Sequence, residues 1–226
     1  MARSVIVTGG FGVLGQAVAE AFAGQGDKVA RIDFAPTAAK AVAGALDIGG
    51  VDLTDAAATE AALAQVAAAH GGIDVLVNVA GGFTWETLEG GSIDSWSRMQ
   101  AMNLISNATI TKLALPALVK SGAGRIVNIG AGAAIRAGMG MGAYAASKSG
   151  VHRLTEALAE ELSAQGVTVN AILPSIIDTP TNRADMPDAD FSQWVQPSAI
   201  ADVILFLASD AARAVTGALV PVTRGG

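Results

Sequence analysis

The chain contains no cysteine and is poor in charge, tyrosine and histidine. Its 226 residues include no Cys, one Tyr and two His, and only 15% are charged. Without Cys, a disulfide scaffold and a thiolate metal site are excluded. Disordered chains combine low hydrophobicity with high charge, whereas 51% of these residues are hydrophobic. We therefore expect a folded protein with a large apolar core.

Two further absences bear on partners and location. The 14 Lys and Arg are outnumbered by 20 Asp and Glu, and no basic cluster occurs, so nucleic acid is not an expected partner. No apolar run reaches the ~18 uninterrupted residues of a membrane span. Met1–Ser4 leads directly into a strand-like run rather than a signal peptide. We expect a cytoplasmic protein without membrane contact, whose sparse surface charge favours self-association.

Short apolar runs alternate with longer alanine-rich stretches along the chain. Helices are expected to begin at the N-caps Thr54 and Ser198. Alternating strands and helices imply right-handed crossovers and a parallel sheet covered on both faces. We predict an α/β fold, a single doubly wound parallel sheet of the Rossmann type, with residues 1–226 as one domain. The expected strands are 4–8, 28–33, 46–51, 73–79, 125–129, 167–173 and 219–222, the expected helices are 13–23, 36–44, 54–70, 92–121, 143–165 and 198–209, and residues 130–142 and 179–197 are expected to be irregular.

A glycine-rich turn follows the first expected strand. Gly10–Gly15 fits G-x-G-x-x-G, which lets a backbone approach a pyrophosphate at a helix N-terminus. Asp33 ends the second strand 18 residues after Gly15, where an acid binds the adenosine ribose. A carboxylate there repels a 2′-phosphate, which favours NAD(H) over NADP(H). Two alternatives stay open: Asp33 as a turn residue, and Arg31, placed on the same face as Asp33, as a 2′-phosphate ligand.

The single tyrosine, Tyr144, precedes Lys148 by four residues. On a helix the two side chains share a face. A phenol near pKa 10 is a poor acid or base at neutral pH, but a nearby ammonium lowers the pKa. The pair is therefore a candidate proton donor to a carbonyl or imine.

Several motifs in the same order along nearly the whole chain resemble the short-chain dehydrogenase/reductases. The resemblance implies a nicotinamide-dependent oxidoreductase in which Tyr144 is the acid/base. Lys148 would bind the nicotinamide ribose and lower the Tyr144 pKa, Asn103 would hold a proton-relay water, and Asn78 would brace strands beside the cofactor. An alternative for Asn103 is an amide bonded to a neighbouring main chain. The motifs are Thr8-Gly9 with the glycine turn, Asp52-Leu53, Asn78-Val79-Ala80-Gly81, Asn103, Tyr144-Ala145-Ala146-Ser147-Lys148, and Pro174 with Thr179.

The resemblance also assigns a cofactor site. Asp52 and Leu53 would lie against the adenine, and Thr179 would hold the nicotinamide carboxamide. The expected cofactor-binding residues are Gly9, Gly12, Leu14, Gly15, Asp33, Asp52, Leu53, Asn78, Ala80, Gly81, Tyr144, Lys148, Pro174, Ile177 and Thr179.

The sequence departs from the family pattern at three places. The family usually has a serine 13 residues before the tyrosine, and this chain has Ala131. One donor to the substrate oxygen is then missing, and loss of such a donor typically costs about 10²–10³ in rate. The usual turn has Gly at the position of Val13, and Ser175 replaces a glycine after Pro174.

These departures resemble the dihydropteridine reductases, which use NADH and a Tyr/Lys pair without the serine. The similar stretches are the glycine turn, 79–83, 173–183 and 186–194. We expect a reductase of a small carbonyl, imine or quinonoid compound, with quinonoid pterin reduction or 3-oxoacyl/ketone reduction as alternatives. A silent NAD-binding sensor is the non-enzymatic alternative. Expected substrate contacts are Phe83, Ala131, Met141 and Trp194, with Trp85, Met139 and Phe191 as further candidates for the pocket wall or for ordinary packing.

The expected partners are a small-molecule substrate and further copies of the chain. The resemblance implies dimers or tetramers, with one interface through the helical regions 92–121 and 143–165 and another through strand 219–222. The histidines His70 and His152 are too isolated to predict a metal site.

Overall fold

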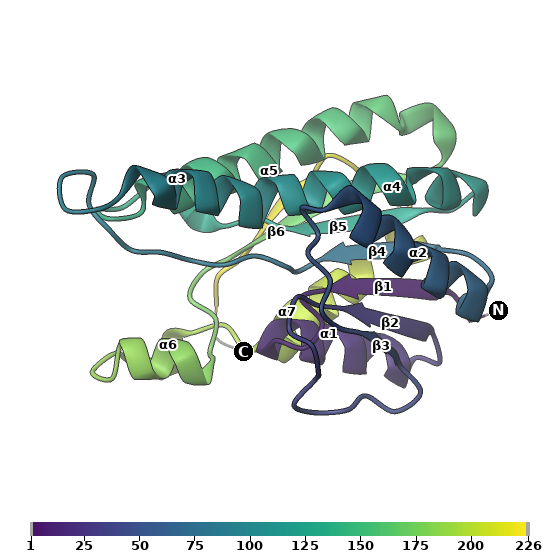
Figure 1. Ribbon diagram of the computed structural model, residues 1–226, viewed down its shortest axis with the longest axis horizontal. Helices are drawn as coiled ribbons and strands as arrows, with labels where there is room; N and C mark the ends of the chain where they lie inside the picture. The colour runs from purple at the N-terminus through teal and green to yellow at the C-terminus, as the bar shows by residue number, and fades with distance from the viewer. Residues whose placement is uncertain (1, 225–226) are drawn as a thin grey trace.

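The computed structural model describes residues 2–224. Within these residues, seven parallel strands form one sheet in the order β3-β2-β1-β4-β5-β6-β7. Figure 1 shows the twisted sheet between helical layers. The predicted α/β class and doubly wound parallel sheet are confirmed. The strands are β1 (Ser4–Thr8), β2 (Lys28–Ile32), β3 (Leu46–Ile48), β4 (Val75–Asn78), β5 (Arg125–Ile129), β6 (Thr168–Pro174) and β7 (Leu219–Val222).

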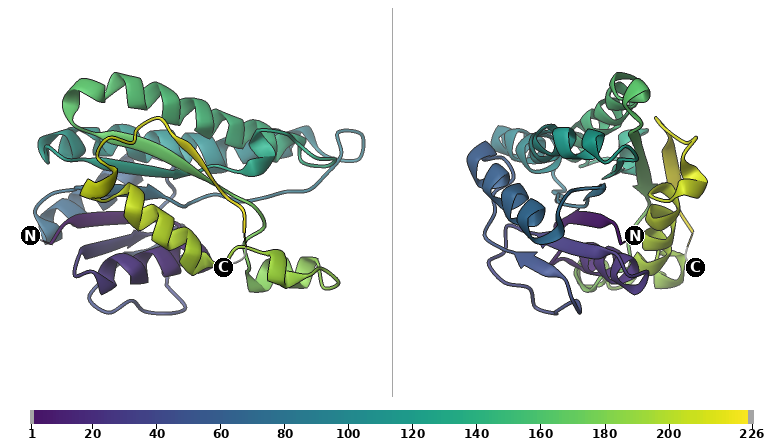
Figure 2. Two further views of the ribbon diagram at one scale, coloured as in Figure 1. Left: turned by 180° about the vertical axis from the view of Figure 1, so that it is seen from behind. Right: turned by 90° about the vertical axis from the view of Figure 1, so that its right-hand side faces the viewer.

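Helices cover both faces of this sheet. Helices α2 (Ala56–His70), α4 (Ser106–Lys120) and α5 (Gly142–Glu161) pack on one face through residues such as Leu63, Ile110 and Leu158. Helices α1 (Val13–Gly24) and α7 (Pro197–Leu207) cover the other through residues such as Phe22 and Ile204. The end-on view in Figure 2 separates the two layers. The central strands are buried along their whole length and are mostly apolar, because helices cover both faces.

The predicted helix at 36–44 is wrong. Residues 34–45 form bends and turns instead. Pro36 lies near the start of this segment and Gly44, with φ +74°, near its end. The Lys40 carbonyl accepts a bond from the buried Arg31 guanidinium. Tertiary contacts therefore shape this segment, although its alanines favour a helix.

Both predicted N-caps are also wrong. Asp55 caps α2, because its carboxylate accepts the N–H groups of Ala57 and Ala58. Thr54 instead donates its hydroxyl to Asp52. Helix α7 begins at Pro197 with Gln196 at the cap position and no side-chain cap. Proline suits this first position because its missing N–H would have no helical partner.

The long helical region 92–121 is divided. It consists of α3 (Ile93–Met99), a π-helical turn (Gln100–Ile105) and α4, which contains Pro116. The region 179–197, expected to be irregular, contains the short helix α6 (Pro180–Asp185). Figure 1 shows α6 and the loop before α3 projecting beyond the same end of the sheet.

Candidate active site

The predicted site residues gather at the carboxyl ends of the strands. Strand β1 lies between β2 and β4, so the chain leaves β1 toward one half of the sheet and later enters the other. In open α/β sheets, ligands bind in the crevice at this reversal of strand order. The glycine turn follows β1, Asp33 follows β2 and Ala80-Gly81 follow β4.

Three glycines of this turn, Gly9, Gly12 and Gly15, have different surroundings. Gly9 has φ +61°, and a Cβ there would lie 2.9 Å from the Ala80 Cα. Gly15 packs against the Gly9 carbonyl, so a side chain at Gly15 would collide with backbone. Gly12 is exposed, and a Cβ there would meet only the Gly9 oxygen at 3.5 Å. Gly9 and Gly15 are thus needed by the fold, while Gly12 leaves open space beside the N-terminus of α1, which suits an anionic group.

Asp33 lies directly beside this turn. Its Oδ2 accepts the Phe11 N–H at 2.9 Å, and its Oδ1 accepts the Ala35 N–H at 2.9 Å. The half-buried carboxylate is therefore fixed at the edge of the glycine turn. The alternative that Arg31 binds a 2′-phosphate is wrong, because its side chain is fully buried and paired with Asp47.

Of the other predicted cofactor residues, some are exposed, while others are buried or hold the strands together. Asp52 is exposed, and hydrogen bonds from Thr54 lower the pKa of its carboxyl group. Leu14 and Leu53 are buried in the core. The Ala80 N–H donates to the Thr8 Oγ1 at 3.1 Å, which joins the ends of β1 and β4.

Asn78 forms part of a buried polar network. Its Nδ2 donates to the Oδ1 atoms of Asn107 and Asn128 and to the Thr111 Oγ1, at 2.9–3.2 Å. Asn128 in turn donates to Thr155 on α5. This network links β4, β5, α4 and α5 beneath the site.

Lys148 and Asn103 lie together at Gly81, and Tyr144 lies one helical turn before Lys148 on α5. A Cβ on Gly81 would lie 2.5 Å from the Asn103 Oδ1 and 3.3 Å from the Lys148 Nζ. Asn103 donates to the Ser147 Oγ at 2.9 Å, and Ser147 donates to the Tyr144 carbonyl at 2.7 Å. The loop after β4, the π-helical turn and α5 thus meet at one point.

The side chain of Asn103 is held by main chain. Its Oδ1 accepts the Gly82 N–H at 2.8 Å, and its Nδ2 donates to the Gly82 carbonyl at 3.1 Å. This geometry matches the alternative of a main-chain contact. The π-helical turn places Asn103 for these bonds, and such turns are frequent at functional sites.

Burial shifts the pKa values of both Tyr144 and Lys148. Burial raises the pKa of Tyr144 to about 12. Burial also lowers the pKa of Lys148 to about 8. The Lys148 Nζ donates to the Ile129 carbonyl at 2.8 Å. The expected lowering of the Tyr144 pKa does not occur in this structure, because desolvation dominates, and the phenol is protonated at neutral pH.

Ala131 occupies the position of the missing serine and is 4% exposed. Its N–H donates to the Nε2 of buried His152 at 3.3 Å. Burial, followed by the positive charges of Arg153 and Lys148, lowers the pKa of His152. His152 therefore holds the end of β5, a contact that the sequence pattern did not indicate.

The predicted substrate residues have different surroundings. Phe83 is 54% exposed and packs edge-on against Tyr144, with ring centroids 4.9 Å apart. Met141 is half-buried at the cap position of α5, while Trp85 and Met139 are exposed. Trp194 is 4% exposed and packs on Phe191 at 4.7 Å, so it forms the core of the projecting segment.

The projecting segment after β6 is closed on itself. Buried Pro174 ends β6, and Ile177 pairs with Val195. The Thr179 hydroxyl oxygen accepts the Asn182 N–H at 3.1 Å and caps α6. Asp178, predicted only as part of a motif, accepts two bonds from Arg183, which hold the pKa of its carboxyl group down at about 2.

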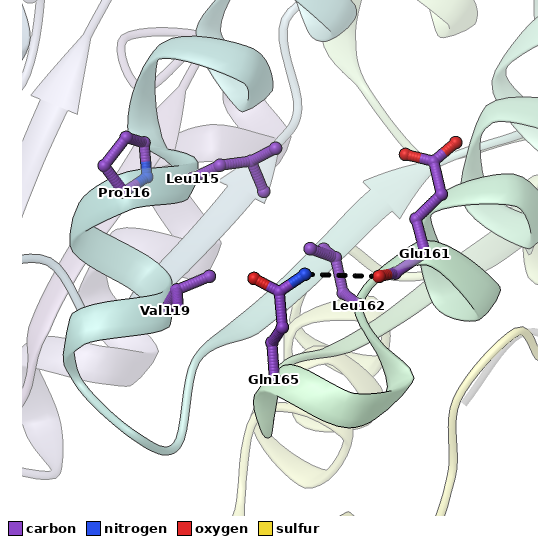
Figure 3. Close-up of a pocket in the computed structure, with 6 residues that line it drawn as sticks. All are labelled: Leu115, Pro116, Val119, Glu161, Leu162 and Gln165. Atoms are coloured by element: carbon purple, nitrogen blue, oxygen red, sulfur yellow. Dashed lines mark hydrogen bonds between the residues drawn. The ribbon is translucent and has the colours of Figure 1, made fainter.

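A separate hollow lies between α4 and the end of α5 (Figure 3). It has a volume of about 490 Å³. Both helices run antiparallel to the strands here, so their C-terminal ends lie at the opposite edge from the candidate site. The lining residues are Leu115, Pro116, Val119, Glu161, Leu162 and Gln165. Within residues 2–224, no helix is long and apolar enough to cross a membrane.

A doubly wound parallel sheet with a glycine turn between its first strand and first helix is the fold of dinucleotide-binding enzymes. The family model of the short chain dehydrogenases matches residues 3–190. The chain belongs to this family, and the predicted enzyme class is confirmed.

Relatives cover nearly the whole chain. It is 36% identical to the 2,5-dichloro-2,5-cyclohexadiene-1,4-diol dehydrogenase LinX of Sphingobium indicum, over 99% of this chain and 95% of that protein. It is 32% identical to the 3-oxoacyl-[acyl-carrier-protein] reductase FabG of Escherichia coli, over 99% of this chain and 96% of that protein.

A solved structure supports the same family. The 3-ketoacyl-(acyl-carrier-protein) reductase of Brucella melitensis, complexed with NADH, superposes with a TM-score of 0.89 at 25% identity. The superposition covers 98% of this chain and 96% of that one.

Proposed function

We propose that this chain is a cytoplasmic, NAD(H)-dependent reductase or dehydrogenase acting on a small carbonyl, imine or quinonoid compound, or on the corresponding reduced form. The observation that carries the proposal is that the Lys148 and Asn103 side chains meet at Gly81, beside the glycine turn, with Tyr144 one helical turn before Lys148 on α5. Residues 1–226 act as one cofactor-binding and catalytic unit.

The candidate cradle fits a dinucleotide. Gly12 leaves open space at the N-terminus of α1, and Asp33 is fixed beside the turn. In our proposal Gly9, Gly12 and Gly15 hold the pyrophosphate, Asp33 holds the adenosine ribose and Lys148 holds the nicotinamide ribose. The other cofactor residues would be Leu14, Asp52, Leu53, Asn78, Ala80, Gly81, Pro174, Ile177 and Thr179.

Tyr144 moves the proton in the proposed reaction. During reduction of a carbonyl it donates its phenolic proton to the substrate oxygen, and during oxidation it takes a proton from the alcohol. When bound, a nicotinamide cofactor would supply the hydride for reduction or accept it in oxidation. Asn103 fixes the Gly81-Gly82 backbone beside Lys148, and Lys148 supplies positive charge near the developing phenolate.

The substrate is proposed to be small and largely apolar. Phe83 stands edge-on beside Tyr144, and exposed Trp85 and Met139 lie on the neighbouring loops, as substrate-pocket walls commonly do. Half-buried Met141 and buried Ala131 would complete the wall, whereas Trp194 supports it from within the projecting segment. A small cyclic diol, the compound class in the name of the relative from Sphingobium indicum, is one candidate of this size.

The proposed function is tested by the substrates that the protein reduces and by the effect of an added hydrogen-bond donor to the substrate oxygen. We expect NADH oxidation with activated cyclic ketones or with quinonoid dihydropterin, the second candidate substrate, followed by absorbance at saturating cofactor. Ala131→Ser should raise kcat/KM on simple ketones about tenfold or more, because it adds a donor to the substrate oxygen. Turnover of no ketone, imine, quinone or pterin, with NADH still bound tightly, would contradict the proposal and favour the silent sensor.

Cofactor choice gives a separate prediction. Asp33→Ser should weaken NADH binding and strengthen NADPH binding, so that the ratio of their Kd values changes at least tenfold, because a charge that repels the 2′-phosphate is removed. Fluorescence titration with each cofactor measures both constants. Asp202 is an exposed residue on α7, so Asp202→Ser removes the same charge elsewhere and serves as the control. Preference of the wild-type protein for NADPH would contradict the role of Asp33.

Self-association is proposed through the outer helices. Helices α4 and α5 lie side by side in both views of the layer (Figures 1 and 2). Exposed Ile105 and the hollow of Figure 3 border this pair. We propose a dimer through these helices, and a tetramer if β7 forms the second interface.

A further inference from the structure

Arg31 is a buried charge placed under the glycine turn. It lies on β2, two residues before Asp33, and its side chain has no exposed area. Its neighbours in this strand, Val29, Ala30 and Ile32, are apolar. A charged residue is almost never fully buried unless its partners compensate the lost hydration. The partners of Arg31 therefore show why a charge occurs here.

The guanidinium joins four separate chain segments. Nε and Nη2 form a bidentate pair with Asp47 at 2.7 and 2.6 Å, across the β2–β3 register. Nη1 faces the Gln16 Oε1 on α1 at 2.6 Å, the Lys40 carbonyl at 3.1 Å and the Gly10 carbonyl at 3.3 Å. We call these residues (Gly10, Gln16, Arg31, Lys40 and Asp47) the Arg31 cluster.

The Arg31 cluster also fixes the Phe11 side chain. The guanidinium carbon lies 5.2 Å from the centre of the Phe11 ring, a cation–π contact. The Phe11 N–H is held by Asp33, the residue that directly follows β2. A Cβ on Gly10 would lie 2.6 Å from the Arg31 Cβ, so the turn rests directly on the arginine stem.

Stability alone does not account for this arrangement. Only Arg31 is buried, because the Asp47 side chain is 37% exposed, and an ion pair that reaches solvent contributes little net stability. What the guanidinium adds is a fixed geometry, because its planar fork holds several acceptors in one place. Three of these acceptors belong to the glycine turn, the first helix and the segment after Asp33, which all border the proposed cofactor site.

We infer that Arg31 is a positioning residue for the cofactor, which it never touches. It holds Gly10, Gln16 and Phe11 so that the turn is already arranged when the dinucleotide binds. This inference rests on the proposed function of the glycine turn. Preorganisation of a binding loop raises affinity because less conformational freedom is lost on binding.

Direct titration with NADH tests the inference without any substrate. Arg31→Met should raise the Kd for NADH about tenfold, while kcat at saturating NADH stays within twofold of wild type. Arg3→Met is the matched control: Arg3 also pairs with an aspartate, Asp27 at 2.7 Å, but at the start of β1. The control should leave the Kd unchanged even if the melting temperature falls.

A double variant separates positioning from simple destabilisation. Arg31→Met with Asp47→Asn removes both charges, so no unpaired carboxylate remains, and should restore the melting temperature but not the Kd. Recovery of the wild-type Kd in the double variant, or an unchanged Kd in Arg31→Met, would overturn the inference. Wild-type protein that binds NADH but turns over no substrate would instead overturn only the proposed reaction.

Discussion

Replacement of Tyr144 by phenylalanine is expected to reduce kcat on the order of 10³-fold, within the range that a general acid or base contributes. The ring, and its edge-on contact with Phe83, would remain. The only group removed is the hydroxyl that moves the proton. Steady-state rates of NADH oxidation on the best substrate measure the effect.

Binding and pH dependence complete this test. The Kd for NADH should change less than threefold in Tyr144→Phe, and the melting temperature should stay close to that of wild type. Since burial raises the Tyr144 pKa to about 12, the phenol is protonated at neutral pH. Alcohol oxidation should therefore rise with pH above 7 in the wild type and show no such rise in the variant. A variant with wild-type turnover would contradict the proposed mechanism.

Replacement of Lys148 by methionine is expected to change activity and stability in opposite directions. Turnover should fall on the order of 10²-fold, because positive charge beside the reacting group is lost. At pH 7 the apoprotein should become more stable. Burial lowers the Lys148 pKa from 10.5 to about 8, which corresponds to on the order of 3 kcal/mol against the charged form. Loss of the bond to Ile129 offsets part of this gain.

The pH dependence of this stability has a defined sign. Between about pH 8 and the ordinary pKa of 10.5, the unfolded chain binds more protons at Lys148 than the folded chain. Wild-type stability therefore rises with pH in this window relative to the variant. Urea unfolding at pH 7.0 and 9.5 should show a smaller difference between the two proteins at the higher pH. A constant difference, or wild-type activity in Lys148→Met, would contradict the assignment.

The elements predicted most accurately from the sequence are those that local pattern determines. The bounds of β1, β5 and β7 match the prediction because each is a short apolar run with breakers beside it. The helix predicted at 36–44 failed because its conformation depends on Arg31, which lies outside that segment. Thr54 failed as a cap because Asp55, one residue later, has the carboxylate that reaches the first N–H groups.

In the candidate site, too, features set by local sequence could be predicted, whereas features set by tertiary packing could not. The shared face of Tyr144 and Lys148 follows from their spacing on one helix. The direction of the Tyr144 pKa could not be predicted, because burial depends on the loops that cover the ring. Trp194 was expected to face a substrate, but the pairing of Ile177 with Val195 closes its segment and buries it. The Arg31–Asp47 pair depends on the register of two strands, which the separate sequence segments do not specify.

Because of the π-helical turn at Gln100–Ile105, the number of residues in this helical region determines the direction in which Asn103 points. An α-helix advances by about 100° per residue, given 3.6 residues per turn. Loss of one residue here would convert the π-helical turn to ordinary α-helix. Asn103 would then rotate away from Gly82, while α4 would keep its packing on the sheet. Substitutions on the exposed side of α3 leave this angle unchanged, whereas a one-residue insertion or deletion alters it. Variation in this part of the chain is therefore constrained in residue number more strongly than in residue type.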